Sequence, residues 1–174
     1  MTLRLDLNGM KIQLNIRNYQ PYDHEEEDSN WCKVDYSFDF ANCISYSKQD
    51  DEVLMSVEIE VLKCRLDDFI ENRIESKYHL SFAEPDYEFI FIPSYNRVEA
   101  GECVYCRPGY EMTAPVIEWR INLWDDGLTD NYFSTTLDTD DAIVLRDYLR
   151  LVIGEIDEDS KIIQEHIAKG FIVS

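Results

Sequence analysis

Basic residues are scarce in this 174-residue sequence. It holds 16 Lys and Arg against 36 Asp and Glu, which gives a formal net charge of −20 at pH 7. Nucleic acids and anionic membranes bind to basic surfaces, so we expect neither as a partner. The chain is also 45% hydrophobic and 13% aromatic, which is too apolar for a disordered acidic tail. The acidic residues are therefore expected on the surface of a folded body.

Glycine and histidine are also few, and their placement argues against several kinds of catalytic site. The six glycines form neither a P-loop nor a Gly-x-Gly-x-x-Gly phosphate cradle. His24, His79 and His166 stand in no metal-binding spacing and in no Ser/His/Asp motif. Adjacent carboxylates are abundant, but neighbours in sequence usually point in different directions. We therefore expect no catalytic residue, no metal ion and no cofactor, and we do not expect an enzyme.

Long apolar runs are missing as well. No uncharged apolar stretch approaches the roughly 18 residues that suggest a membrane span. The N-terminus is charged from Arg4 onward, without the apolar segment of a secretory signal. We therefore predict a cytoplasmic location, where thiols stay reduced. The five cysteines are Cys32, Cys43, Cys64, Cys103 and Cys106.

Hydrophobic periodicity indicates an α+β fold. Apolar and polar residues alternate in most of the chain, and Asn8-Gly9 is a strong turn signal between the first two strands. Over residues 53–74 the period becomes three to four, which predicts one central amphipathic helix that begins near Ser56. A further helix is predicted after Asp138 or Thr139, and a shorter one spans 160–169.

We predict a single domain over residues 1–174. It consists of a largely antiparallel β-sheet of about eight to ten strands, the central helix and the C-terminal helices. The predicted strands are the hairpin 3–16 and the segments 30–40, 43–47, 53–55, 78–83, 87–93, 116–124 and 132–137.

Residues 96–105 have no clear period, and an edge strand is one interpretation of them. The segment leads into Cys103-Val104-Tyr105-Cys106, which is the cysteine spacing with metal or redox content. Zinc would require further ligands, and no predicted helix follows to stabilise a thiolate. We favour two thiols near an edge strand. Whether Cys103 and Cys106 form a disulfide or bind metal stays open.

Residues 23–29, Asp-His-Glu-Glu-Glu-Asp-Ser, predict an acidic loop, since no strand or core would accommodate them. Short motifs surround this loop and follow in order: Tyr22-Asp23, then Asn30-Trp31, then the helix 57–69 with Glu58 and Leu62, then Glu84-Pro85 leading into Tyr87-Glu88-Phe89. Over most of residues 1–150 their order and spacing resemble the WapI-like immunity proteins of bacterial polymorphic toxin systems. The chain departs from that pattern in the acidic insert 25–28, in Cys32 and in the last helix.

The resemblance implies an intracellular antidote that binds and occludes a cognate toxin domain, often a nuclease. A nuclease needs a basic surface for its substrate, and an acidic protein can compete for that surface as a charge mimic. We expect the partner to be a basic toxin. The residues predicted to contact it are Tyr22, Asp23, Glu25, Glu26, Glu27, Asp28 and Trp31, with Asp125 and Asp126 as a second patch.

Two other classes of function stay open at this point. A small-molecule or metal-binding protein on a β-sheet scaffold would show a concave apolar pocket with convergent polar groups. A structural or regulatory adaptor would show an exposed apolar patch. The sequence does not determine whether the chain forms a homo-oligomer.

Overall fold

The computed structural model describes residues 1–21, 30–41, 43–125 and 127–173. Its elements follow one another in the order β1 (Thr2–Leu7), β2 (Met10–Arg17), β3 (Trp31–Phe40), β4 (Ile44–Met55), α1 (Ser56–Ile70), β5 (Tyr78–Ser81), β6 (Tyr87–Ile92), β7 (Val116–Trp124), β8 (Leu128–Leu137), α2 (Thr139–Val152), α3 (Lys161–Ala168) and β9 (Ile172–Val173). The predicted α+β fold with antiparallel strands, a central helix and C-terminal helices is confirmed.

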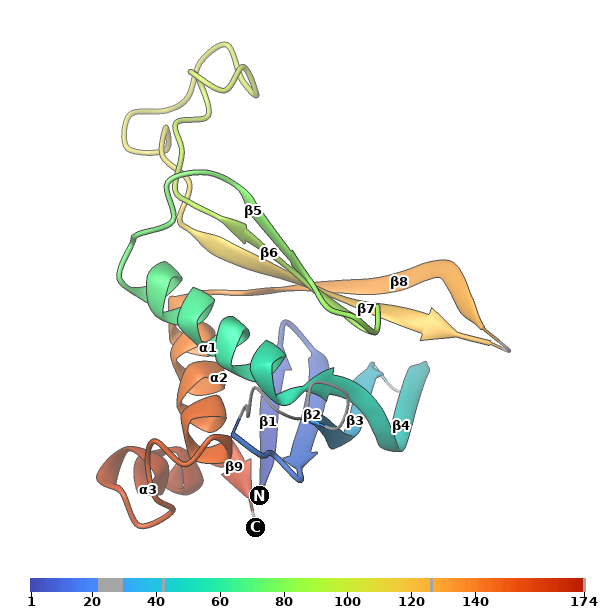
Figure 1. Cartoon of the computed structure of the whole chain (residues 1–174). Coiled ribbons are helices and arrows are strands. Elements are labelled where there is room, and N and C mark those ends of the chain that lie inside the picture. Colours follow the sequence, from blue (N-terminus) through green and yellow to red (C-terminus); the bar gives the residue numbers. More distant parts are fainter. Residues whose placement is uncertain (22–29, 42, 126, 174) are drawn as a thin grey trace.

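The strands form two antiparallel sheets. The first has the order β4-β3-β2-β1-β9 and the second the order β5-β6-β7-β8. In Figure 1 the four-stranded sheet lies above the five-stranded one, and α1 and α2 lie at the left of both. The two termini lie side by side, because β9 pairs with the start of β1 through Thr2 and Val173.

Aromatic side chains join the two sheets. Tyr36 of β3 meets Tyr87 of β6 with ring centroids 5.0 Å apart, and Phe38 meets Phe133 of β8 at 4.6 Å. Both pairs are edge-to-face, the arrangement that the ring quadrupole favours. One buried apolar cluster includes residues from both sheets and from all three helices. Strands of both sheets therefore turn their apolar faces to this shared core.

The helices begin where their side chains satisfy the first free backbone groups. The Asp138 carboxylate accepts a hydrogen bond from the Asp141 backbone N–H at 3.0 Å, and the Asp141 carboxylate accepts one from the Asp138 backbone N–H at 3.3 Å. This capping box fixes the start of α2. Tyr148 of α2 is fully buried, and its hydroxyl accepts a hydrogen bond from the Ile16 backbone at 2.9 Å. That contact holds α2 against the five-stranded sheet.

Two expectations need correction. The segments 43–47 and 53–55, predicted as separate strands, belong to the single strand β4. The charged residues between them are tolerated because β4 is an edge strand with side chains open to solvent. The edge-strand interpretation of residues 96–105 is wrong. They belong to an arm between β6 and β7, residues 93–115, in which Asn96 and Met112 form one isolated bridge.

Candidate partner-binding surface

Most of the residues predicted to contact a partner lie outside the described residues. These are Tyr22, Asp23, Glu25, Glu26, Glu27, Asp28 and Asp126. Trp31 and Asp125 are described. The structure places these two residues and the chain on either side of 22–29.

Ser56, the first residue of α1, holds the chain on both sides of the segment 22–29. The Gln20 backbone N–H donates to Ser56 Oγ at 3.2 Å, and the Ser56 N–H donates to the Asn30 carbonyl at 2.8 Å. Ser56 is completely buried. Nearby, the Tyr19 hydroxyl donates to Glu60 of α1 at 2.6 Å. The chain thus leaves and re-enters the described structure at the N-terminal end of α1.

Trp31 follows directly as the first residue of β3. It is half-buried, and its partner across the sheet is Met55, the last residue of β4. The next residue, Cys32, is buried, with its sulfur 3.6 Å from Ser56 Oγ. Burial raises the pKa of this thiol. Cys32 is therefore a packing residue that fixes the position of Trp31 beside α1.

Asp125 lies in the exposed turn between β7 and β8, and it forms no ion pair within the described ranges. The adjacent Trp124 N–H donates to the Tyr46 hydroxyl at 3.3 Å, and Tyr46 pairs with Phe38 in the sheet. Trp31 and Phe38 are seven residues apart on β3, or about 23 Å at the rise of a strand. The structure therefore does not bring Trp31 and Asp125 together, because they lie near opposite ends of β3.

The acidic excess remains after local pairing. Arg17 lies 2.8 Å from Asp35, and Lys33 lies 2.9 Å from Glu52. A hydrogen bond from the Asp50 backbone, together with Arg17, lowers the pKa of Asp35. Most Lys and Arg side chains in the described ranges are paired in this way. Few Lys and Arg side chains therefore remain to offset the charge of the other carboxylates.

A second acidic loop connects α2 and α3, and the sequence interpretation overlooked it. Asp157, Glu158 and Asp159 are exposed there and form no ion pair with any described residue. A groove of about 290 Å³ beside them is lined in part by Met1 and Tyr148. The signal was the run 155–159, which contains four acidic residues in five positions.

Asp86 is the centre of a buried polar cluster where the two sheets meet. Its Oδ1 accepts hydrogen bonds from the Tyr36 hydroxyl and from Lys48 Nζ, both at 2.7 Å. Lys48 also lies 4.5 Å above the ring of Trp124. Burial raises the pKa of Tyr36, so the phenol stays protonated as a donor. This cluster therefore stabilises the contact between the sheets.

No group of three His, Cys, Asp or Glu side chains that could hold a metal ion occurs among the described residues. None of the described helices is both long and apolar enough to cross a bilayer. In comparisons with known proteins, the model of the immunity protein WapI-like family matches residues 3–116. No curated protein matches the chain. The match contains Trp31, the segment 22–29 and the arm, and it ends before Asp125 and the loop 155–159.

Proposed function

We propose, from the premise that this chain belongs to the WapI-like immunity protein family, that it binds a cognate toxin domain and neutralises it through an acidic surface. An immunity protein has a toxin as its partner. The observation that supports an acidic contact is the net charge of −20, which local ion pairs do not offset. A basic toxin, such as a nuclease, is attracted by this charge and loses its substrate surface when it binds.

The proposed contact begins at the segment Glu25–Asp28, with Tyr22, Asp23 and Trp31 at its base. Asp125 and Asp126 form a second patch. A standard interface buries about 800 Å² on each partner, a patch about 30 Å across. The roughly 23 Å of β3 from Trp31 to Phe38, whose neighbour Tyr46 contacts Trp124 beside Asp125, fit within one such interface. We propose that a single toxin domain contacts both Trp31 and Asp125.

The charge has a kinetic role in this proposal. Electrostatic steering raises association rates toward about 10⁸–10⁹ M⁻¹s⁻¹ at low salt. Rapid capture favours an antidote because a toxin acts until it is bound. We propose that the protein works in the cytoplasm as a stoichiometric binder, and that catalysis plays no part in neutralisation.

Co-expression with the toxin domain encoded beside the gene tests the function. We expect the wild-type chain to rescue growth and to form a complex with the toxin. Replacing Glu25→Gln, Glu26→Gln and Glu27→Gln together should slow association about tenfold at low salt, and the difference should shrink at high salt. Stopped-flow binding measures both rates.

The matched control removes three acidic charges elsewhere, by Asp157→Asn, Glu158→Gln and Asp159→Asn. These residues lie outside the region that the family model matches. We expect this triple variant to associate almost as fast as wild type. If neither variant slows association at low salt, the charge-mimic proposal is wrong. If the wild-type chain does not neutralise the toxin, the function itself is wrong.

A further inference from the structure

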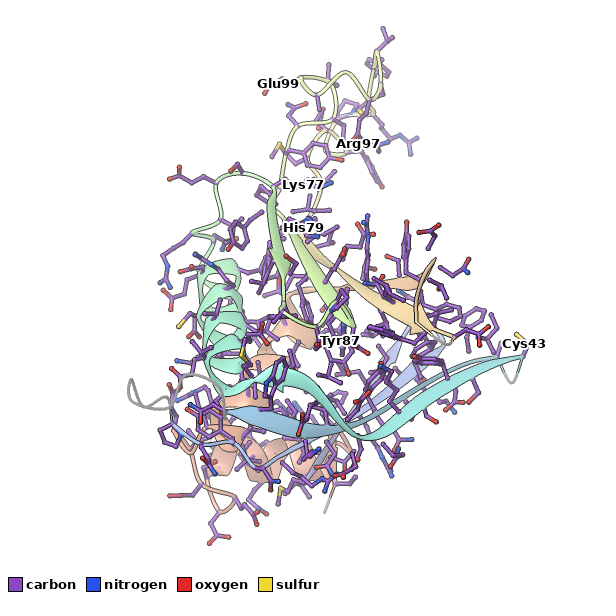
Figure 2. The ribbon with its side chains drawn as sticks, turned by 45° about the vertical axis from the view of Figure 1, so that its right-hand side comes forward. Cys43, Lys77, His79, Tyr87, Arg97 and Glu99 are labelled. Carbon is purple, nitrogen blue, oxygen red and sulfur yellow. The ribbon has the colours of Figure 1, made fainter. Side chains whose placement is uncertain are left out.

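The arm, residues 93–115, extends away from both sheets (Figure 1). Arg97 and Glu99 lie on it, far from Tyr87 at the centre of the molecule (Figure 2). Hydrogen bonds across the arm give it an ordered shape: the Arg97 N–H donates to the Glu111 carbonyl at 2.8 Å, and the Thr113 N–H donates to the Tyr95 carbonyl at 2.9 Å. The arm is therefore a preformed projection.

Large apolar side chains within residues 104–112 of the arm are exposed to solvent. Val104 is 100% exposed, Tyr105 78%, Tyr110 65% and Met112 56%. Large exposed apolar groups close together are unusual on a monomer and mark interaction sites. Tyrosine in particular anchors protein interfaces, since its ring buries a large area and its hydroxyl forms a hydrogen bond. The core of the molecule makes no use of these four side chains.

The charges of the arm and of the whole chain indicate what kind of partner binds to the arm. The arm carries Arg97 and Arg107 against Glu99, Glu102 and Glu111, a net charge of −1 in a chain of −20. Two copies of a chain with charge −20 repel each other, so a second copy is a poor occupant. A basic protein with an apolar cleft is attracted by the whole molecule and accommodates the nearly neutral arm. Both the arm and the acidic segment 25–28 lie in the region that the family model matches.

We propose that the arm is the anchoring element for the toxin, with Tyr105 and Val104 inserted into an apolar cleft of the toxin domain. This inference rests on the proposed function. A groove of about 550 Å³ beside the arm, lined in part by Tyr110, Met112 and Val116, accepts an apolar side chain of the toxin in return. The acidic surface accelerates encounter, and the arm slows dissociation.

The test uses the full chain and the toxin domain encoded beside its gene. We expect Tyr105→Ala to weaken binding about 30-fold, mainly through faster dissociation, with association almost unchanged. Val104→Ser should act in the same direction. Neither side chain packs in the core, so thermal unfolding should be that of wild type. Ile162→Ala on α3, another exposed apolar residue, is the matched control and should bind normally.

The outcomes separate the two proposals. If the wild-type chain does not bind the toxin, the proposed function fails. If wild type binds and Tyr105→Ala binds equally well, the arm proposal fails and the function stands. If analytical ultracentrifugation shows a wild-type dimer that Tyr105→Ala converts to a monomer, the arm binds a second copy and the proposal is overturned.

A second inference concerns Cys103 and Cys106, the two cysteines that flank Val104 and Tyr105. The sulfur atoms of Cys103 and Cys106 lie 2.6 Å apart, and both residues are half-buried between exposed neighbours. A disulfide bond measures about 2.05 Å, so only a small movement separates the two thiols from a bond. A bond between them would close the tip of the arm into a small ring.

We infer that Cys103 and Cys106 are a reversible dithiol–disulfide pair, oxidised by a low-molecular-weight disulfide such as oxidised glutathione. One thiolate attacks the glutathione disulfide, forms a mixed disulfide and releases one glutathione thiolate. The second protein thiolate then attacks the mixed disulfide and releases the other. The protein loses two electrons and two protons, and oxidised glutathione becomes two molecules of glutathione.

Peptide mapping by mass spectrometry after incubation with oxidised glutathione tests this pair. We expect a Cys103–Cys106 bridge in the wild-type chain, reversed by dithiothreitol. In the Cys103→Ser variant, Cys106 should instead keep a bound glutathione. The exposed Cys43 and Cys64 are internal controls for simple glutathione adducts. Separate adducts on Cys103 and Cys106 of the wild-type chain, or no reaction there while Cys43 reacts, would overturn the inference.

Discussion

Asp86 is a carboxylate that the fold removes from solvent. It is only 2% exposed. Its carboxylate accepts a hydrogen bond from the Tyr36 hydroxyl and forms an ion pair with Lys48. Its backbone carbonyl accepts from the Asn122 N–H at 2.9 Å. One residue thus contacts β3, β4 and β7. A buried charge is tolerated only while its partners are present.

Replacement of Asp86 should therefore be costly. We expect Asp86→Ala to lower the free energy of unfolding by about 3–5 kcal/mol, because Lys48 and the Tyr36 hydroxyl lose their shared acceptor. Asp86→Asn should cost less, since the amide oxygen still accepts one hydrogen bond. Urea unfolding measures both. The exposed Asp130 forms no ion pair with any described residue, so Asp130→Ala should change stability by no more than about 0.5 kcal/mol. Equal effects at Asp86 and Asp130 would contradict this account.

At the scale of whole elements, hydrophobic periodicity predicted the strands that have one buried and one polar face. Ile117, Trp119 and Ile121 alternate with polar residues, and β7 has the predicted bounds, because a half-buried strand needs that pattern. The division into two sheets depends on which strands pair, and no local pattern records it. The strand β9 has two residues, too few for any period. Strand β4 was predicted as two strands because its middle residues are charged. Only its position at the edge of the sheet explains why a strand tolerates them.

The candidate surface was predictable in part for the same reason. The acidic residues are visible in the sequence, and so are the turn at Asp125 and the strand that starts at Trp31. The distance between these two depends on strand register, through the pairing of Phe38 with Tyr46. The arm was missed because exposure has no signature in a segment without a period. Nothing in Val104-Tyr105 alone distinguishes a projecting tip from a strand.

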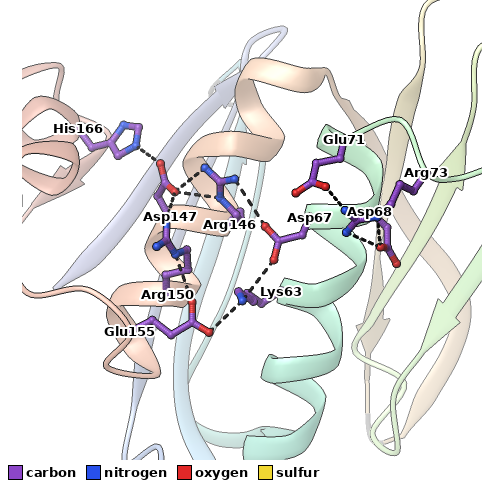
Figure 3. A network of polar contacts seen from close by, with 10 residues as sticks. All are labelled: Lys63, Asp67, Asp68, Glu71, Arg73, Arg146, Asp147, Arg150, Glu155 and His166. Atoms are coloured by element: carbon purple, nitrogen blue, oxygen red, sulfur yellow. Dashed lines mark hydrogen bonds and ion pairs between the residues drawn. The ribbon is translucent and has the colours of Figure 1, made fainter.

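A network of charged side chains joins the three helices (Figure 3). Asp147 of α2 is 2% exposed, lies 2.8 Å from Arg146 and lies 2.9 Å from His166 of α3. Arg146 also reaches Asp67 of α1 at 3.6 Å. The network thus supplies polar contacts between the helices in addition to the apolar core, and α3, which is only eight residues long, joins it through His166.

Removal of Asp147 should loosen α3 before the rest of the molecule. We expect Asp147→Ala to lower the free energy of unfolding by about 3–5 kcal/mol, since Arg146 and Arg150 lose a buried partner. Amide hydrogen exchange should show reduced protection in α3 first. The control is Lys161→Ala, because Lys161 is 90% exposed and its pair with Glu165 is at the surface. Uniform loss of protection across both sheets, with α3 unaffected, would show that the network does not hold this helix.

The charge of the whole molecule acts over a longer range than any of these contacts. At pH 7 the excess of carboxylates gives −20, and repulsion among them disfavours the compact state. Some carboxylates behave differently. Lys63 lowers the pKa of Glu155, and the Asp50 backbone with Arg17 lowers that of Asp35. A folded pKa below the unfolded value means that these groups stabilise the fold above the unfolded pKa and lose this contribution as the pH falls through the folded pKa.

Salt should consequently have opposite effects on the stability of the fold at pH 7 and at pH 4.3. At pH 7, raising the ionic strength from about 0.01 to 0.15 M shortens the Debye length from about 30 to 8 Å, and we expect the urea midpoint to rise because repulsion is screened. At pH 4.3, the sequence pI, net repulsion vanishes, while ion pairs such as that of Arg17 with Asp35 persist, because the pKa of Asp35 is lowered from an ordinary value that is already below this pH. Salt then weakens these pairs, and the midpoint should fall slightly. Urea is the denaturant of choice because it adds no ions. A midpoint that moves in the same direction at both pH values would show that net charge does not govern the stability of this fold.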